Sequence, residues 1–157
     1  FNFNAVDPGH ILFGLTPPGP STSDMKLRPA FHSLKSHIIH IKEVVRQDYP
    51  EMVPFQLRDG LRIGIIPAGL RDGMASLTCG HVLVRGRRMQ ILGPFSLEHT
   101  RIDLTEVPDA EIGDEVVIIG QQEGNTIEQN EVLQYQKIEV KAALALNVGQ
   151  GIPRRYM

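Results

Sequence analysis

The sequence predicts a mainly β fold, an antiparallel barrel-like domain with one or two short helices. Short runs rich in isoleucine, valine and leucine alternate with turn sequences such as Asp-Gly, Gly-Asp and Arg-Gly-Arg, which favour tight reversals. The turns follow one another too closely for the crossover helices of a parallel sheet. The expected strands are residues 34–45, 61–67, 81–85, 89–95, 101–105 and 115–120.

One helix is expected near the end of the chain. Thr126 and Gln129 have the spacing of a capping box, in which two side chains satisfy free backbone donors. The spacing predicts a helix from there to about Tyr135, followed by a last β-rich segment over residues 138–148. At the other end, residues 16–23 are dense in proline and glycine and indicate a linker.

Composition narrows the classes of function. The chain has 157 residues, of which 41% are hydrophobic and 22% charged, as in ordinary globular domains. A net charge of -2 gives no reason to expect nucleic acid or an anionic membrane as the main partner. The single cysteine, Cys79, excludes an internal disulfide, fits a reducing compartment, and leads us to expect a cytoplasmic location. The chain opens at Phe1 without an initiator methionine, so we expect further sequence upstream.

Histidine and cysteine offer little obvious chemistry. Residues three apart in one strand point to opposite faces, so His37 and His40 are not expected to share a metal ion, and no metal site is predicted. Cys79 and His81 are expected on one face of a strand, as in a thiolate–imidazole pair. With no orienting acid beside them, a small buried cysteine is the favoured interpretation.

Basic side chains gather around one glycine turn, at Arg85, Arg87 and Arg88. We interpret them as a solvated hairpin tip in preference to a phosphate site, and no aromatic residues interleave with them to stack on bases. Composition and spacing alone therefore predict a mostly β globular domain and nothing more specific.

Six sequence blocks, in order along the chain, resemble the carboxy-terminal part of alanine racemases. Residues 65–73 resemble the family's "P-x-G-Y-x-D-G", and residues 93–105 resemble "G-x-x-S/C-M-D-Q-T…D-x-T". Each block is weak by itself, but the ordered set is specific. The remaining blocks are residues 6–14, 27–42, 113–120 and 153–154.

The resemblance implies an enzyme that depends on pyridoxal 5'-phosphate (PLP), built from an amino-terminal (β/α)8 barrel and a β-domain. Residues 1–20 would be a remnant of the last barrel element and a linker, and residues 21–157 the β-domain. The family forms homodimers in which the β-domain of one subunit completes the site of the other. The lysine that forms the Schiff base would lie upstream of Phe1.

Site residues follow from the same resemblance. The backbone N–H groups of Gly9 and His10 would hold the cofactor phosphate, with Asp7 beside the pyridine nitrogen, where the family has arginine. A carboxylate there would favour a protonated pyridine and a stronger electron sink. The β-domain would supply the partner's substrate pocket, through Leu70, Ser96, Leu97 and Glu98.

Several pocket positions depart from the family pattern. Phe55 falls where the family has its catalytic tyrosine, and without a hydroxyl it cannot exchange a proton with the substrate. The alignment there needs small gaps, so Tyr49 remains a possible substitute. Leu70 replaces a tyrosine, Leu97-Glu98 replaces Met-Asp, and Ala142 replaces a phosphate-contacting tyrosine, whereas Arg154 keeps the family's place.

Two functions are consistent with this pattern. The first is the carboxy-terminal part of a PLP-dependent amino-acid racemase-like enzyme, which abstracts a proton from the α-carbon. The isolated segment would be inactive and would bind no cofactor. The second is a non-catalytic β-domain kept for dimerisation or ligand binding, because the pocket hydroxyls are missing. We also expect residues 1–15 to be disordered or to pack against a second copy.

Overall fold

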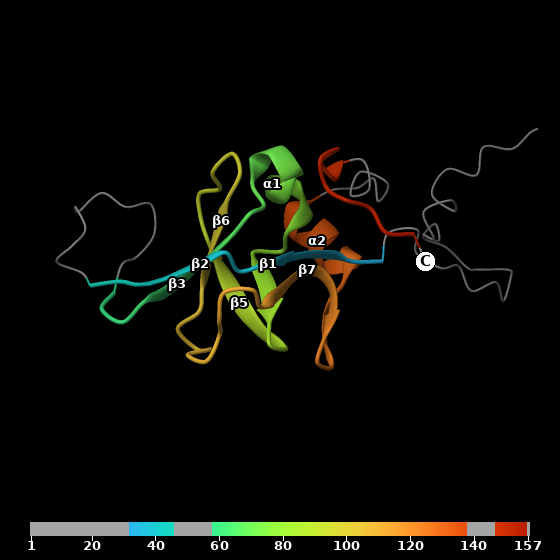
Figure 1. The fold of residues 1–157 in the computed structure, drawn as a ribbon. Coiled ribbons are helices and arrows are strands. Elements are labelled where there is room, and N and C mark those ends of the chain that lie inside the picture. The colour runs from blue at the N-terminus through green and yellow to red at the C-terminus, as the bar shows by residue number, and fades with distance from the viewer. Residues whose placement is uncertain (1–31, 46–57, 138–146, 157) are drawn as a thin grey trace, which may run out of the picture.

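The computed structural model describes residues 32–45, 58–137 and 147–156 (Figure 1). Within these ranges the chain forms one curled antiparallel sheet with two short α-helices beside it. The strands are β1 (Leu34–His37), β2 (His40–Glu43), β3 (Arg62–Ile66), β4 (His81–Val84), β5 (Arg87–Leu92), β6 (Thr100–Asp103), β7 (Glu115–Gln122) and β8 (Asn125–Ile127). A 3-10 turn, η3 (Leu70–Asp72), precedes the helix α1 (Met74–Leu77), and α2 (Gln129–Gln136) follows β8.

The sheet runs in the order β1-β7-β4-β5-β6-β3-β2, and β8 adds to β7. Its two ends, β1 and β2, are neighbours along the chain, so the sheet curls back on itself without closing its ladder. β5 contributes to the curl because its first four residues pair with β4 and its last two residues pair with β6. The expected fold class, mainly antiparallel and barrel-like with short helices, is confirmed.

The prediction of a single strand over residues 34–45 is wrong, because this segment forms two strands, β1 and β2. The N–H of Ile38 donates to Asp114 O on the β7 side at 3.0 Å, whereas that of Ile39 donates to Ile65 O of β3 at 2.8 Å. The chain thus leaves one end of the sheet and joins the other between these two residues. Ile38 is fully buried at the crossing, which anchors the bend in the core.

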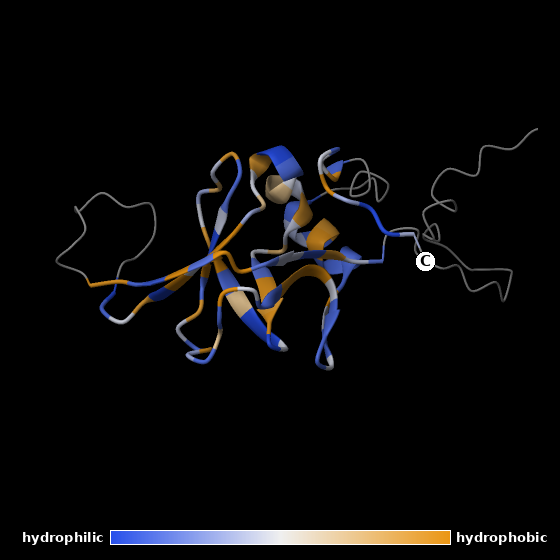
Figure 2. Ribbon diagram, in the orientation of Figure 1, coloured by the Kyte–Doolittle hydropathy of each residue, from blue (hydrophilic) through white to orange (hydrophobic). Residues whose placement is uncertain are grey.

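The core lies inside the curl. On β7 every residue from Val116 to Gly120 is buried, and Figure 2 shows hydrophilic residues at the ends of the β4–β5 and β7–β8 hairpins. The helices α1 and α2 contact each other and contribute two buried residues each. The largest fully buried side chains are Ile38, Leu61, Ile66, Met74, Leu77, Leu83, Ile102, Leu104, Ile118, Ile119 and Ile127.

The predicted capping box is wrong. Thr126 lies in β8, opposite Gln121 of β7, and the residue before the helix is Glu128, whose side chain makes no capping bond. Gly124 has a positive φ of 83° and turns the chain back along β7. Ile127 can then bury itself opposite Gly120, so sheet pairing and burial prevail over the local capping preference. The helix nevertheless ends at Gln136, one residue from the expected end.

Several predicted features lie outside the described residues. These are the linker at residues 16–23 and nearly all of the expected strand at residues 138–148. No helix in the described ranges is both long enough and apolar enough to span a membrane.

Candidate functional site

Two loops meet beside the sheet and bring the predicted substrate-pocket residues together. One loop leads from β3 into η3, and the other joins β5 to β6. The N–H of Leu70 donates to Ser96 O, and the N–H of Arg71 donates to Leu97 O, both at 3.0 Å. Leu70 therefore lies next to Ser96, Leu97 and Glu98, although these residues are far from it in the sequence.

Glycine makes this close approach possible. A Cβ on Gly69 would lie 2.5 Å from Leu97 O and 2.6 Å from Glu98 N, which no real side chain tolerates. The N–H of Gly69 donates to the carboxylate of Asp72 at 2.9 Å. One residue earlier, the buried hydroxyl of Thr100 donates to Ala68 O at 2.6 Å. The loop is thus held by backbone and side-chain bonds at successive residues.

A third segment, near the end of the chain, packs against the same loop. The N–H of Gly149 donates to Asp72 O at 3.2 Å. Gly73 adopts a positive φ of 91°, and a Cβ there would lie 2.0 Å from Asn147 O. Arg154, expected from the resemblance to keep its family place, donates to Val148 O at 3.4 Å. Sequence reasoning missed this support, because a glycine marks a tight contact but does not name the residue it contacts.

The surface of the two loops combines apolar side chains with an ion pair. Leu70 is 46% exposed and Leu97 is 71% exposed. The residue after each leucine is charged, and Arg71 and Glu98 form an ion pair at 3.0 Å. We call the surface made by Leu70, Arg71, Leu97 and Glu98 the leucine shelf. It presents two exposed hydrocarbon side chains and two charges that compensate each other.

Ser96 shapes the β5–β6 loop. Its hydroxyl donates to His99 O and accepts from the N–H of His99, each at 2.9 Å. Its own N–H also donates to His99 O, at 3.1 Å. The hydroxyl is therefore engaged in the turn that presents Leu97 and Glu98.

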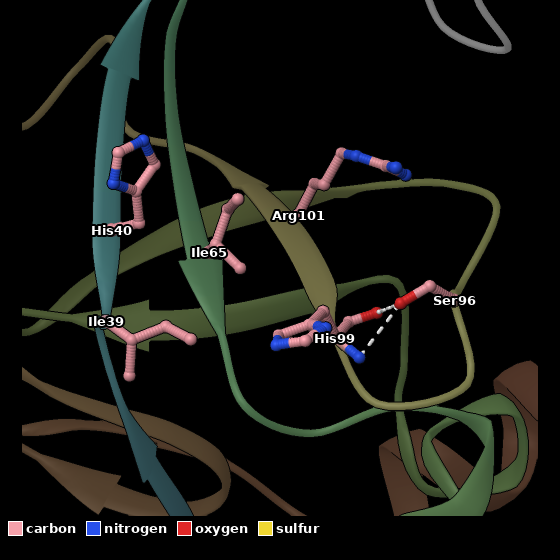
Figure 3. A pocket seen from close by; sticks show the side chains of 6 residues that line it. All are labelled: Ile39, His40, Ile65, Ser96, His99 and Arg101. Atoms are coloured by element: carbon pink, nitrogen blue, oxygen red, sulfur yellow. Dashed lines mark hydrogen bonds between the residues drawn. The ribbon is translucent and has the colours of Figure 1, made fainter.

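A shallow hollow of about 270 Å³ lies beside this turn, on the outer face of β2, β3 and β6 (Figure 3). His40, Ile65 and Arg101 are register partners across the three strands. Figure 3 shows His40 and Arg101 on either side of Ile65, so their polar groups do not converge. Arg101 donates to Pro94 O at 3.3 Å. The lining residues are Ile39, His40, Ile65, Ser96, His99 and Arg101.

The positions of the remaining histidine and cysteine candidates decide which chemistry they can support. His37 ends β1 and His40 begins β2, so the expected arrangement along one strand is wrong. No group of three or more potential ligands gathers for a metal ion within the described ranges. Cys79 lies ahead of β4, which begins at His81, so the two do not share a strand face. The thiol is buried, and burial raises its pKa, which fits a packed cysteine and disfavours a nucleophile.

Each arginine of the β4–β5 hairpin meets a carboxylate. Arg85 contacts Asp114 at 2.8 Å and Asp109 at 2.6 Å. Its guanidinium bonds lower the pKa of both carboxyl groups. Arg87 lies 3.7 Å from Glu106 and Arg88 donates to Glu131 at 2.8 Å. The arginines therefore bind other parts of the fold, and the phosphate-site interpretation loses its donors.

Within the described residues, the fold is a curled antiparallel β-domain in which the loop from β3 to η3 is bonded to the β5–β6 loop. The profile of the family described as "Alanine racemase, C-terminal domain" matches residues 31–156. The chain belongs to this family.

Individual relatives agree with this assignment. The chain is 30% identical to an alanine racemase of Halothermothrix orenii, over 99% of this chain and 41% of that protein. It is 33% identical to alanine racemase 2 of Caldanaerobacter subterraneus, over 97% of this chain and 39% of that protein. The structure of Bacillus anthracis alanine racemase with bound L-Ala-P matches with a TM-score of 0.71 and 26% identity, over 88% of this chain and 36% of that one. The chain thus spans about two fifths of the length of these curated relatives.

The other predicted site residues lie outside the described ranges. These are Asp7, Gly9 and His10, expected at the cofactor, Phe55 and Tyr49, expected near the reacting carbon, and Ala142.

Proposed function

We propose that this chain is the carboxy-terminal part of a PLP-dependent amino-acid racemase-like enzyme, and that the leucine shelf forms one wall of its substrate site. Family membership supports the reaction class. One observation carries the assignment of the site, namely the backbone pairing of residues 70–71 with residues 96–97. This pairing brings three of the predicted substrate-pocket residues, Leu70, Leu97 and Glu98, onto one exposed surface, with the half-buried Ser96 beside them.

The cofactor would be held by other parts of the protein. Within the described ranges, the arginines of the β4–β5 hairpin are paired with carboxylates and leave no ready phosphate site there. The expected phosphate donors are the N–H groups of Gly9 and His10, with Asp7 at the pyridine nitrogen, in a barrel remnant over residues 1–20. When bound, PLP supplies an electron sink that stabilises the negative charge left by removal of the α-proton.

The leucine shelf orients the substrate and excludes water, and it does not transfer the proton. Among its members, Glu98 is the natural base, but its carboxylate is paired with Arg71. Phe55 has no hydroxyl to exchange a proton, which leaves Tyr49 as a candidate for that role. An isolated segment of this kind would be inactive, and we propose that a second subunit supplies the missing groups in a cytoplasmic homodimer.

A complementation experiment on the full-length protein tests this proposal. One parent carries the upstream Schiff-base lysine changed to alanine, and the other carries Leu70→Glu with Leu97→Glu on the shelf. Each homodimer should be inactive. If the site is shared between subunits, equal mixing by co-refolding restores about a quarter of wild-type activity, because half of the dimers are mixed and each mixed dimer holds one intact site.

Three measurements accompany the mixing. Sedimentation checks that the parents are dimers, the near-visible absorption of bound PLP checks cofactor loading, and chiral chromatography of amino acids measures racemisation. Inactive mixtures of well-folded, cofactor-loaded parents would contradict the shared site. Full-length wild-type protein without cofactor absorption would contradict the racemase assignment itself.

The second candidate function is a non-catalytic β-domain. It is favoured by the apolar character of Leu70 and by the lack of an unpaired acid or base on the leucine shelf. Racemisation of any amino acid by the full-length protein, abolished when the upstream lysine is changed, would exclude it.

A further inference from the structure

Backbone contacts hold the two leucines of the leucine shelf in place. Leu70 and Leu97 belong to two loops whose backbones are joined by two hydrogen bonds of 3.0 Å. Gly69 brings those backbones into contact with no room for a side chain, and Gly149 supports the first loop through Asp72. A surface held in place in this way loses little entropy when a ligand binds to it.

The two charges of the shelf compensate each other. Arg71 and Glu98, which flank the two leucines, are paired at 3.0 Å. A charged side chain placed against Leu70 and Leu97 would lose hydration without gaining a partner of its own, which is costly. Acidic and basic substrates are therefore disfavoured at this surface.

The hydroxyl next to the shelf is also engaged. The hydroxyl of Ser96 both donates to and accepts from the backbone of His99. A polar substrate group would have to break that turn to obtain a hydrogen bond. The attraction that remains is hydrocarbon contact with Leu70 and Leu97, which are 46% and 71% exposed.

We propose that the leucine shelf selects amino acids with an uncharged aliphatic side chain longer than the methyl group of alanine. The inference rests on the proposed function and adds the substrate class. Catalytic efficiency should rise about fourfold for each methylene that contacts the leucines, the change that corresponds to burial of one CH2 group. Leu70 and Leu97 are then the residues that determine specificity.

The test is a substrate series on full-length, PLP-loaded protein. The series is L-alanine, L-2-aminobutyrate, L-norvaline and L-leucine, with L-aspartate and L-lysine as charged members. We expect kcat/KM to rise from alanine to norvaline by about fifteenfold, two methylene steps, and to fall below the alanine value for aspartate and lysine.

Variants of the two leucines test whether the shelf causes the rise of kcat/KM with the length of the substrate side chain. Leu70→Ala and Leu97→Ala remove exposed side chains, so both proteins should fold with nearly wild-type thermal stability. Each should reduce the norvaline-to-alanine ratio, mainly through KM, and the double variant should bring the ratio to within about twofold of unity. Ile112→Ala is the matched control, because Ile112 is 64% exposed and lies outside the shelf; it should leave the ratio unchanged.

The outcomes separate this inference from the proposed function. If alanine is racemised but the series is flat, or if the leucine variants leave the ratio unchanged, the inference fails and the proposed function stands. A preference for aspartate overturns the inference too, and would direct attention to Arg101 in the adjacent hollow. If cofactor-loaded protein racemises no member of the series, the proposed function fails and the inference fails with it.

Discussion

Replacing Gly69 with alanine should separate the two loops of the candidate site. The added Cβ would lie 2.5 Å from Leu97 O and 2.6 Å from Glu98 N. Both atoms belong to the backbone and cannot rotate away as the end of a side chain could. The contact is relieved by moving the loops apart, which weakens the hydrogen bonds from Leu70 to Ser96 and from Arg71 to Leu97.

The expected cost of Gly69→Ala follows from these two effects. Each hydrogen bond contributes about 1 kcal/mol net, and overpacking of a close contact costs about 1–3 kcal/mol. If the loops part far enough to lose both bonds, part of the overpacking is relieved, so the two costs do not add fully. We expect the free energy of unfolding to fall by about 2–4 kcal/mol.

Urea denaturation followed by circular dichroism measures this loss. Gly151→Ala is the control, because a Cβ on Gly151 meets no atom within 4 Å; it should change stability by less than about 1 kcal/mol, in the stabilising direction. Equal stabilities for the two variants would refute the argument that Gly69 is required by the approach of the 96–98 backbone.

Two further predictions concern ionisable groups. The Arg88 guanidinium lowers the pKa of the Glu131 carboxyl, so this pair stabilises the fold above the ordinary glutamate pKa and the contribution is lost as pH falls through the lowered value. Glu131→Gln should therefore cost at most about 1 kcal/mol at neutral pH, because both groups are partly exposed, and the difference from wild type should vanish in acid; a difference that grows in acid would contradict the pairing. The pKa of the Cys79 thiol is raised by burial, so a disulfide reagent at pH 8 should label it at least about tenfold faster in urea than in the native state. Equal labelling rates would show that the thiol is accessible in the folded protein.

Local patterns predicted most of the strands. The apolar runs that became β3, β6 and β7 place apolar side chains in the core whichever strand each of them pairs with. Composition and neighbouring turns are therefore sufficient to locate these strands. The candidate site, by contrast, was predicted from the ordered blocks of the resemblance and not from local patterns. Gly69 was visible in the sequence, but the 96–98 backbone that requires it was not.

Three features depended on backbone partners that the local sequence pattern does not identify. Whether residues 34–45 form one strand or two depends on which end of the sheet each half joins, and Ile38 and Ile39 donate to different strands. Thr126 has the spacing of a cap but pairs with Gln121 of β7 instead. The leucine shelf exists because the N–H groups of Leu70 and Arg71 donate to the β5–β6 loop. Along the chain, α1, β4 and β5 lie between these residues and that loop. Hydrophobic periodicity is a local property that one strand carries by itself, whereas edge pairing and loop contact are settled by backbone groups that only the folded chain brings within hydrogen-bonding distance.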